Sequence, residues 1–175
     1  MRLLLKFRME LYRLDKASFL PSFLPSESLD ICPLTKEHLI QIKERYDNKK
    51  IRSFFKQLKK PLRYRGVCVT HNGEVIAYGW VKYKYAKDPF YKIGNVKYFS
   101  SFFVDEKYRG MGIYPAMLSY LIQGEENMDD IYISAYDYNV SSLKGLKKVG
   151  FKLVEKITFK RIFRITLNKF KLKKT

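Results

Sequence analysis

The stretch VDEKYRGMGIYPAMLSYLI, residues 104–122, places two glycines one residue apart between an apolar run and an amphipathic helix. Gly110 and Gly112 have no Cβ atom, so several successive backbone N–H groups can turn toward one point without being shielded. These N–H groups lead into the first helical turn, where they lack intrahelical partners and the helix dipole adds positive potential. Such a turn can hold an anion, most naturally a pyrophosphate, with Arg109 adding charge beside it. Glycines also serve strand-to-helix turns for geometric reasons alone, so both interpretations stay open at this point.

The chain is strongly basic, with a formal net charge of +18 over 175 residues. Its length indicates one domain, residues 1–175. The charge is lopsided, because residues 144–175 carry 12 Lys and Arg against the single acid Glu155. A charge of this size favours anionic partners such as phosphorylated small molecules, nucleic acid or anionic lipid headgroups. The alternative is that many of these lysines simply cover solvated faces.

The cysteines and histidines are few and isolated in the sequence. Cys32 and Cys68 form no CxxC motif, and neither His38 nor His71 stands at a spacing typical of zinc sites. We therefore expect no disulfide framework and no metal site, and a reducing cytoplasm is the expected compartment.

The N-terminal stretch MRLLLKFRMELYRL is too often interrupted to be a signal peptide. Lys6 and Arg8 break its apolar run, and no small-residue cleavage site follows. No segment approaches the roughly 18 apolar residues of a membrane span. These features predict a soluble cytoplasmic protein, with a homodimer as one option for its oligomeric state.

Hydrophobic periodicity predicts a mixed α/β sheet. Asn72-Gly73 favours the tight turn of a hairpin, Thr35 is a candidate N-cap and Gly150 a candidate helix stop. The expected strands are 5–15 (where a helix is the alternative), 29–35, the hairpin 63–83, 95–104, 130–138 and one or two strands in 151–167, and the expected helices are 36–46, 48–60, the helix that includes 115–121, and 139–149. The strand–helix–strand order from residue 95 to residue 138 implies one parallel pair.

Residues 109–113, Arg-Gly-Met-Gly-Ile after a strand, resemble motif A of the GNAT superfamily of acyl-CoA N-acyltransferases. Tyr114 stands where that family usually has Gly or Ala. The larger side chain would crowd the pyrophosphate end of the loop, but we still expect the loop to bind the cofactor. A second match follows at the right distance, because Asn139-x-x-Ser142 and a later Gly-Phe resemble the family's Asn-x-x-Ser segment and its Gly-Phe strand opening.

The resemblance, over about residues 30–165, implies the GNAT fold: a central, mostly antiparallel sheet with a splayed parallel strand pair, here with an extra N-terminal strand. It implies acetyl-CoA as co-substrate, with the pantetheine in the splay and the pyrophosphate on the glycine loop, and no metal. The residues that it assigns to the cofactor are Phe103, Val104, Arg109, Gly110, Met111, Gly112, Ile113, Tyr114, Asn139 and Ser142.

The catalytic residues are not assigned by the resemblance. Many relatives carry a glutamate at the position of Ser100 and a tyrosine at the position of Leu146, so the acid/base pair of those relatives is missing here. The remaining candidates are Ser100, Tyr136 and Tyr138, with Ser134 and Asp137 nearby, although such tyrosines are more often packing residues and Asp137 could help to cap a helix. A water relay with an amine of lowered pKa is an equal alternative.

We therefore predict a bacterial N-acetyltransferase in which a primary amine attacks acetyl-CoA directly in a ternary complex. The basic chain favours a small anionic acceptor, such as a nucleotide-linked amino sugar, while protein amines and antibiotics remain open and polyamines fit least. The main alternative is a GNAT scaffold of reduced catalytic function that binds nucleic acid or another polyanion, because 156–174 alternate bases with aromatic residues. An aminoacyl-transferring relative is disfavoured, since such enzymes usually carry two such domains.

Overall fold

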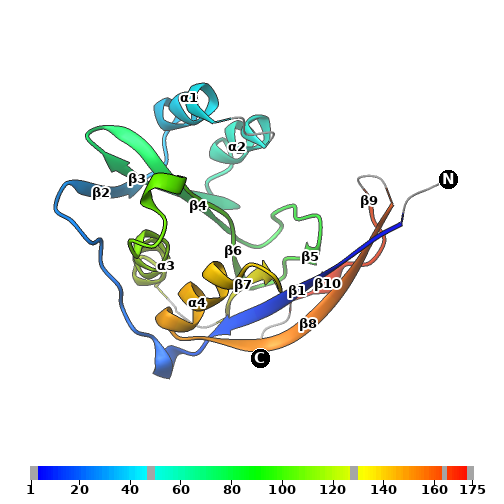
Figure 1. The fold of residues 1–175 in the computed structure, drawn as a ribbon. Helices are drawn as coiled ribbons and strands as arrows, with labels where there is room; N and C mark the ends of the chain where they lie inside the picture. The colour runs from blue at the N-terminus through cyan, green and yellow to red at the C-terminus, as the bar shows by residue number, and fades with distance from the viewer. Residues whose placement is uncertain (1–3, 47–49, 127–129, 163–164, 173–175) are drawn as a thin grey trace.

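The computed structural model describes residues 4–46, 50–126, 130–162 and 165–172 (Figure 1). The elements are β1 (Leu4–Leu14), η1 (Lys16–Ser18), β2 (Leu29–Pro33), α1 (Lys36–Arg45), α2 (Ile51–Leu58), β3 (Tyr64–His71), β4 (Glu74–Lys82), β5 (Tyr91–Lys92), β6 (Lys97–Val104), η2 (Glu106–Tyr108), α3 (Ile113–Gln123), β7 (Ile131–Tyr136), α4 (Val140–Val149), β8 (Phe151–Ile162), β9 (Ile165–Thr166) and β10 (Phe170–Lys171). The start of the second predicted helix, residues 48–49, lies outside the described residues. None of the helices in the described ranges combines the length and apolarity needed to cross a bilayer.

The strands form one large sheet in the order β2-β3-β4-β6-β7-β1-β8-β9. Every neighbouring pair in it is antiparallel except β6–β7, which is parallel. The predicted mixed sheet with one parallel crossover is confirmed, and the N-terminal strand β1 is inserted between β7 and β8. The small parallel pair β5–β10 was not predicted, because two residues per strand are too few to show a period.

Helices cover both faces of the sheet, with α1 and α2 on one side of β3–β4 and α3 on the other (Figure 1). The residues of β3 alternate between these layers. Val67 and Val69 belong to the cluster that packs under α3 and α4, whereas Cys68 belongs to the cluster under α1 and α2. Because both faces are covered, β3 is an almost continuous apolar run rather than an alternating one.

The parallel pair β6–β7 stays paired over a short distance only. Its register runs from Lys97 opposite Ile131 to Phe99 opposite Ile133, and no pairing continues beyond that point although both strands do. The other edge of β6 remains bonded to β4 as far as Val104. The far half of β6 therefore has one edge that no described strand covers.

A bulge reshapes β6 where it leaves β7. The register with β4 shifts between Tyr78 and Trp80, and Ser101 has a left-handed φ of 58°. Opposite the bulge, Gly79 leaves room for the ring of Phe102, since a Cβ on Gly79 would lie 2.4 Å from that ring. Gly79 thus fixes where an aromatic side chain at the end of β6 can lie.

Gly73 and Gly150 both have a left-handed φ, but a side chain would also clash with its surroundings only at Gly150. Gly150 ends α4 with a φ of 101°, and a Cβ there would lie 2.0 Å from the carbonyl oxygen of Ser18. Gly73, in the β3–β4 turn, has a φ of 79° and open space around it. We expect Gly73→Ala to lower the free energy of unfolding by about 1–2 kcal/mol and Gly150→Ala by more than about 3 kcal/mol. Urea denaturation of both variants measures these free energies. Equal losses in the two variants would contradict the steric clash expected between the new Cβ at residue 150 and Ser18.

Candidate functional site

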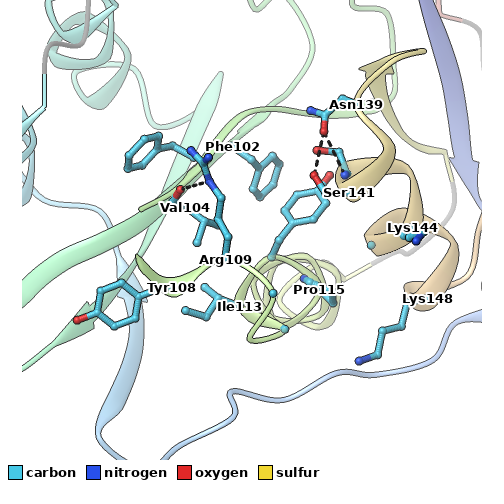
Figure 2. A pocket seen from close by; sticks show the side chains of 16 residues that line it. Phe102, Val104, Tyr108, Arg109, Ile113, Pro115, Asn139, Ser141, Lys144 and Lys148 are labelled. Carbon is cyan, nitrogen blue, oxygen red and sulfur yellow. Dashed lines mark hydrogen bonds between the residues drawn. The ribbon is translucent and has the colours of Figure 1, made fainter. Parts of the chain in front are cut away.

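A cavity of about 670 Å³ opens where β6 separates from β7. Its walls are the end of β6, the loop leading into α3, the first turn of α3 and one face of α4 (Figure 2). The lining residues are Phe102, Phe103, Val104, Tyr108, Arg109, Gly110, Gly112, Ile113, Tyr114, Pro115, Asn139, Ser141, Ser142, Lys144, Gly145 and Lys148.

Nine of the ten residues predicted to contact the cofactor line this cavity. The exception is Met111, which does not line it and whose side chain is 45% exposed. Ser141, Lys144 and Lys148 were missed, although the steps of three and four residues between them place them on one face of a helix. That spacing was the available signal.

The loop before α3 has the conformation of an anion-binding nest. Gly110 and Gly112 have φ values of 83° and 81°, whereas Met111 between them is not in the left-handed region. Alternating backbone signs turn successive N–H groups toward one side. None of the amides of Gly110, Met111 and Gly112 donates to another described residue. A Cβ on either glycine would meet nothing within 4 Å, so conformation rather than crowding requires glycine here.

The free positive charge of the cavity comes from α4 more than from the loop. Arg109 is engaged, since its Nε donates to the carbonyl of Val104 at 3.2 Å and its Nη1 pairs with Glu106 at 3.0 Å. Lys144 and Lys148 lie one turn apart on α4 and form no ion pair with any other described residue (Figure 2). An anion in the cavity would therefore meet two unpaired ammonium groups in addition to the loop amides.

Asn139 serves the backbone of α4. Its side-chain oxygen accepts from the Ser142 backbone N–H at 3.3 Å and from the Ser141 hydroxyl at 3.1 Å, which makes it the N-cap. The carboxamide oxygen is thus used by the helix, and the amide nitrogen remains for a ligand. The two roles expected for this residue are compatible.

Tyr114 lies between α3 and α4. Its ring makes an edge contact with Phe102, with centroids 5.2 Å apart. On the other side it lies against Gly145, where a Cβ would be 2.7 Å from the ring. Burial raises the pKa of the Tyr114 hydroxyl well above its usual range. The cavity stays open beside the tyrosine, because Gly145 leaves space for the ring.

None of the three catalytic candidates, Ser100, Tyr136 and Tyr138, is among the residues that line the cavity. Tyr136 stacks on Tyr138 with centroids 5.1 Å apart and makes an edge contact with Phe7. Tyr138 is 72% exposed, and neither tyrosine lines the cavity. Asp137 forms an ion pair with Arg8 at 3.1 Å. Tyr136 and Asp137 therefore contact residues of β1, Phe7 and Arg8 respectively.

Ser100 and Ser134 are the first residues of β6 and β7 beyond the last paired position, so they mark the point of separation. The Ser134 hydroxyl lies 2.7 Å from the hydroxyl of Tyr98, whose pKa burial raises well above its usual value. The Ser100 hydroxyl is buried and bonds to no other described residue. Leu146, where relatives carry tyrosine, is fully buried in the core.

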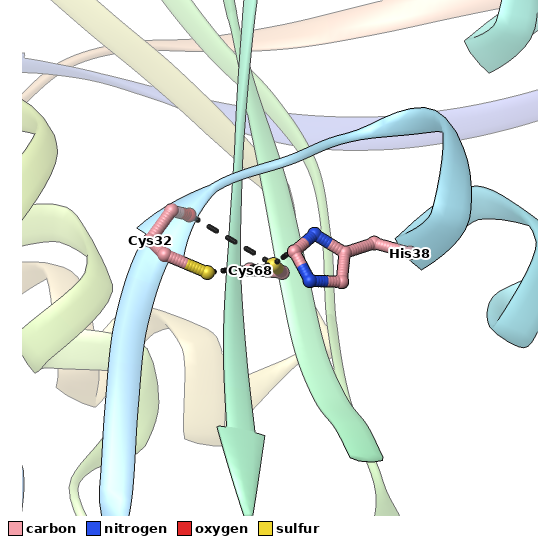
Figure 3. A group of neighbouring side chains, drawn as sticks. All are labelled: Cys32, His38 and Cys68. Atoms are coloured by element: carbon pink, nitrogen blue, oxygen red, sulfur yellow. Dashed lines mark hydrogen bonds between the residues drawn. The ribbon is translucent and has the colours of Figure 1, made fainter. Parts of the chain in front are cut away.

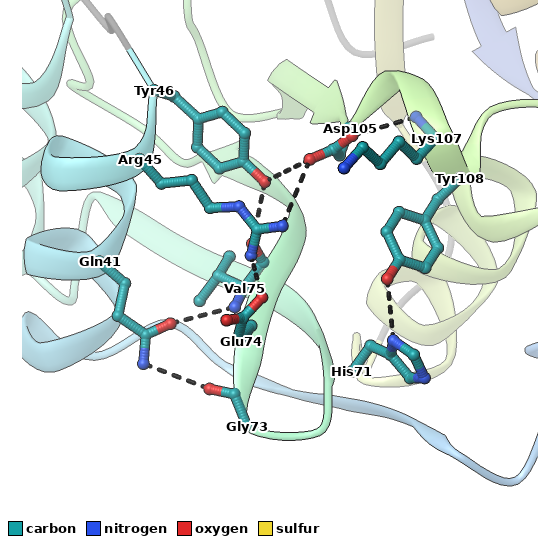
Figure 4. A network of polar contacts seen from close by, with 10 residues as sticks. All are labelled: Gln41, Arg45, Tyr46, His71, Gly73, Glu74, Val75, Asp105, Lys107 and Tyr108. Carbon is teal, nitrogen blue, oxygen red and sulfur yellow. Dashed lines mark hydrogen bonds and ion pairs between the residues drawn. The ribbon is translucent and has the colours of Figure 1, made fainter.

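A polar network anchors α1 to the start of the glycine loop (Figure 4). Tyr46 donates to Asp105 at 2.8 Å, and Arg45 lies 3.8 Å from the same carboxylate. Asp105 also accepts from the Lys107 backbone N–H at 3.0 Å and so caps η2. The Lys107 N–H, Tyr46 and Arg45 together lower the pKa of Asp105. The residue that follows β6 is thereby fixed on both sides.

A sheet that opens at one parallel pair, with an amide nest and a helix N-terminus at the opening, is typical of α/β domains that bind anionic cofactors. The chain belongs to the acetyltransferase (GNAT) family, whose family model matches residues 23–151. Members of this family use acetyl-CoA. No curated protein sequence matches the chain.

Solved structures share this fold at low sequence identity. A GNAT-family acetyltransferase from Colwellia psychrerythraea has a TM-score of 0.65 at 13% identity, covering 89% of this chain and 56% of its own. The aminoglycoside antibiotic 6'-N-acetyltransferase of Acinetobacter baumannii has a TM-score of 0.57 at 16% identity, covering 74% and 94%. An aminoglycoside N-acetyltransferase in complex with CoA also has a TM-score of 0.57 at 16% identity, covering 73% and 95%. The chain spans between about half and two thirds of the length of the first structures that it matches.

Asp105→Asn tests the anchor at the loop. The lowered pKa means that the carboxylate stabilises the fold above its unfolded value, near pH 4, and that this stability is lost as pH falls through the folded pKa. We expect Asp105→Asn to lower the free energy of unfolding by about 1–3 kcal/mol at neutral pH, because charge-assisted hydrogen bonds are lost. The gap from wild type should begin to shrink near pH 4, where the unfolded chain takes up the proton, and close as pH falls through the lower pKa of folded Asp105. Denaturant titrations at both pH values measure it, and a pH-independent gap would contradict the ionised anchor.

Proposed function

We propose that this protein is an N-acetyltransferase that moves the acetyl group of acetyl-CoA, bound in the cavity, to the primary amine of a small anionic acceptor such as a nucleotide-linked amino sugar. The observation that carries the proposal is the nest of unpartnered amides at Gly110, Met111 and Gly112, which opens into a cavity of about 670 Å³. Family membership supports the same activity.

We assign the pyrophosphate, the pantetheine and the remaining phosphate of acetyl-CoA to three surfaces of the cavity. The pyrophosphate would lie on the amides of residues 109–114, as anions do at helix N-termini. The pantetheine, which carries amide groups, would lie along Phe103 and Val104 on the uncovered edge of β6 and pair with the backbone as an added strand does. Lys144 and Lys148 would attract the remaining phosphate charge.

The transfer would proceed by direct attack of a neutral amine on the thioester carbonyl, with coenzyme A leaving as the thiolate. Alignment of the two substrates supplies much of the acceleration, and a backbone N–H can polarise the carbonyl. No carboxylate is among the residues that line the cavity. The ring stack of Tyr136 on Tyr138 makes these two weaker candidates for the proton acceptor, so we favour Ser100, the Ser134–Tyr98 hydroxyl pair or water.

Charge supports an anionic acceptor. At a net charge of +18 the protein repels cations and raises the local concentration of anions. Two structural relatives are aminoglycoside acetyltransferases. Aminoglycosides carry several ammonium groups, so we rank them below nucleotide-linked amino sugars for this chain.

The alternative of a polyanion-binding scaffold is favoured by exposed lysines along β8, among them Lys152, Lys156 and Lys160. Two of these are neutralised within the fold, since Lys152 pairs with Asp15 and Lys156 with Glu10. Because Lys152 and Lys156 are already paired, β8 offers a phosphate backbone fewer free cations than its lysine content suggests.

Gly112→Asp and Gly112→Asn separate charge from shape in the nest. Asp and Asn have nearly the same size and both tolerate a left-handed φ, so the two variants differ mainly by one negative charge. We expect Gly112→Asp to bind acetyl-CoA more than about tenfold more weakly than Gly112→Asn, because a carboxylate would repel the pyrophosphate. Isothermal calorimetry measures both affinities. Equal affinities for the two variants would refute the assignment of this loop.

A panel of amines tests the acceptor. Thiol release from acetyl-CoA should be faster with nucleotide-linked amino sugars than with the same sugars lacking the diphosphate, and slowest with polyamines and aminoglycosides. Retention on heparin across a salt series is measured in parallel. Acetyl-CoA binding without polyanion binding at physiological salt supports the enzyme, whereas salt-resistant heparin binding without thiol release would favour the polyanion scaffold.

A further inference from the structure

Two cysteines and a histidine that are far apart in the sequence meet at the edge of the sheet (Figure 3). Cys32 on β2 and Cys68 on β3 are direct cross-strand partners, with their Sγ atoms 3.5 Å apart. His38, in the first turn of α1, places Nδ1 3.3 Å from Cys68 Sγ. One ligand atom from each of the three residues lies within 4.8 Å of the others. The pairing of β2 with β3 and the start of α1 thus bring together three residues whose spacing in the sequence does not predict a metal site.

The spacing of these atoms fits one metal ion. A tetrahedral zinc ion with Zn–S of about 2.3 Å and Zn–N of about 2.0–2.1 Å holds two sulfurs about 3.8 Å apart and sulfur and nitrogen about 3.6 Å apart. The observed 3.5 Å and 3.3 Å need only small movements outward. We propose that Cys32, His38 and Cys68 bind a thiophilic divalent cation of the zinc class, which reverses the expectation that this chain has no metal site.

The chemistry of the donors selects the class of cation. Two thiolates and an imidazole suit zinc, whereas magnesium and calcium require oxygen ligands, and no carboxylate belongs to the cluster. Cys68 is buried, while Cys32 and His38 are half-buried. The fourth position therefore opens on the side of Cys32 and His38, where water can complete the tetrahedron.

The histidine is the residue that distinguishes a metal site from a pair of packed thiols. His38 occupies the N3 position of a capping box, where its Nδ1 accepts from the Thr35 backbone N–H at 3.2 Å. Glutamate or glutamine is the usual residue for that task. Nδ1 has a single lone pair, and a metal would take it from the Thr35 N–H, which is exposed enough to bond to water. A disulfide would use the two sulfurs alone and leave the imidazole only its bond to the Thr35 N–H.

The cluster lies on the face of the sheet that α1 and α2 cover, whereas the acetyl-CoA cavity lies against α3 and α4. A bound ion would tie the start of α1 to β2 and β3. The other end of α1 already contacts Asp105 through Tyr46. The metal would therefore act as a structural clamp on α1, and its binding does not depend on the proposed transfer activity.

Cobalt(II) is the probe, because thiolate ligation gives it a charge-transfer absorption and tetrahedral geometry gives it intense visible bands. The full chain, reduced, freed of metal by chelation and kept under nitrogen, is titrated with cobalt and then with zinc. We expect one cobalt per chain with thiolate charge transfer, displacement by zinc, and a higher Tm with either ion. Absence of the charge-transfer band in reduced, folded protein would overturn the proposal, as would a Cys32–Cys68 disulfide that forms in air even with zinc present.

His38→Gln is the matched variant, since glutamine keeps the capping box and removes the imidazole. We expect it to keep the metal-free Tm and to bind cobalt at least about tenfold more weakly than wild type. Cys32→Ala, at a half-buried position, should weaken cobalt binding by a similar factor and reduce the thiolate charge-transfer band. Wild-type affinity and spectrum in His38→Gln would show that the imidazole is not a ligand and would overturn the three-residue site. Acetyl-CoA affinity, measured in the same samples, should not change.

Discussion

The separation of β6 from β7 after Phe99 and Ile133 is the constraint on which the candidate site depends. Antiparallel pairing with β4 holds the far half of β6 in place while its other edge loses its neighbour. Backbone groups on that edge need partners, and a cofactor with amide groups can supply them. The glycine loop continues directly from this strand, so the strand edge and the anion nest face the same cavity.

Rigid supports on both sides hold the loop in this position. Asp105 is fixed from the α1 side by Tyr46 and from its own loop by the Lys107 N–H. On the opposite side, α4 approaches α3 closely because Gly145 leaves space for the ring of Tyr114. The nest needs two residues with left-handed φ, a conformation that costs little for glycine. The contacts of Asp105 on one side and of α4 on the other help to hold the loop in that conformation.

The sequence was sufficient where function requires a local motif, and insufficient where it depends on pairing between distant strands. Gly110 and Gly112 identify the loop because a left-handed φ and exposed amides select glycine locally. Lys144 and Lys148 could have been found from helical spacing alone. The approach of Cys32 to Cys68 could not, since it depends on the register of β2 against β3. Tyr136 was equally ambiguous, because a strand-end tyrosine can pack or catalyse, and in the structure its ring stacks on Tyr138.

No carboxylate lines the cavity, but the positive charge of the protein can favour the neutral form of an amine without one. An ammonium group entering a basic, partly desolvated cleft would be disfavoured twice, by repulsion from the net positive charge of the protein and by loss of water. Both effects lower the pKa of the amine, so a larger fraction of it is neutral and nucleophilic before any base acts. An anionic group elsewhere on the acceptor offsets the desolvation by binding the cations. In such a site a proton would need only to reach water, and the hydroxyl of Ser134, 2.7 Å from that of Tyr98, belongs to the first residue of β7 beyond its pairing with β6.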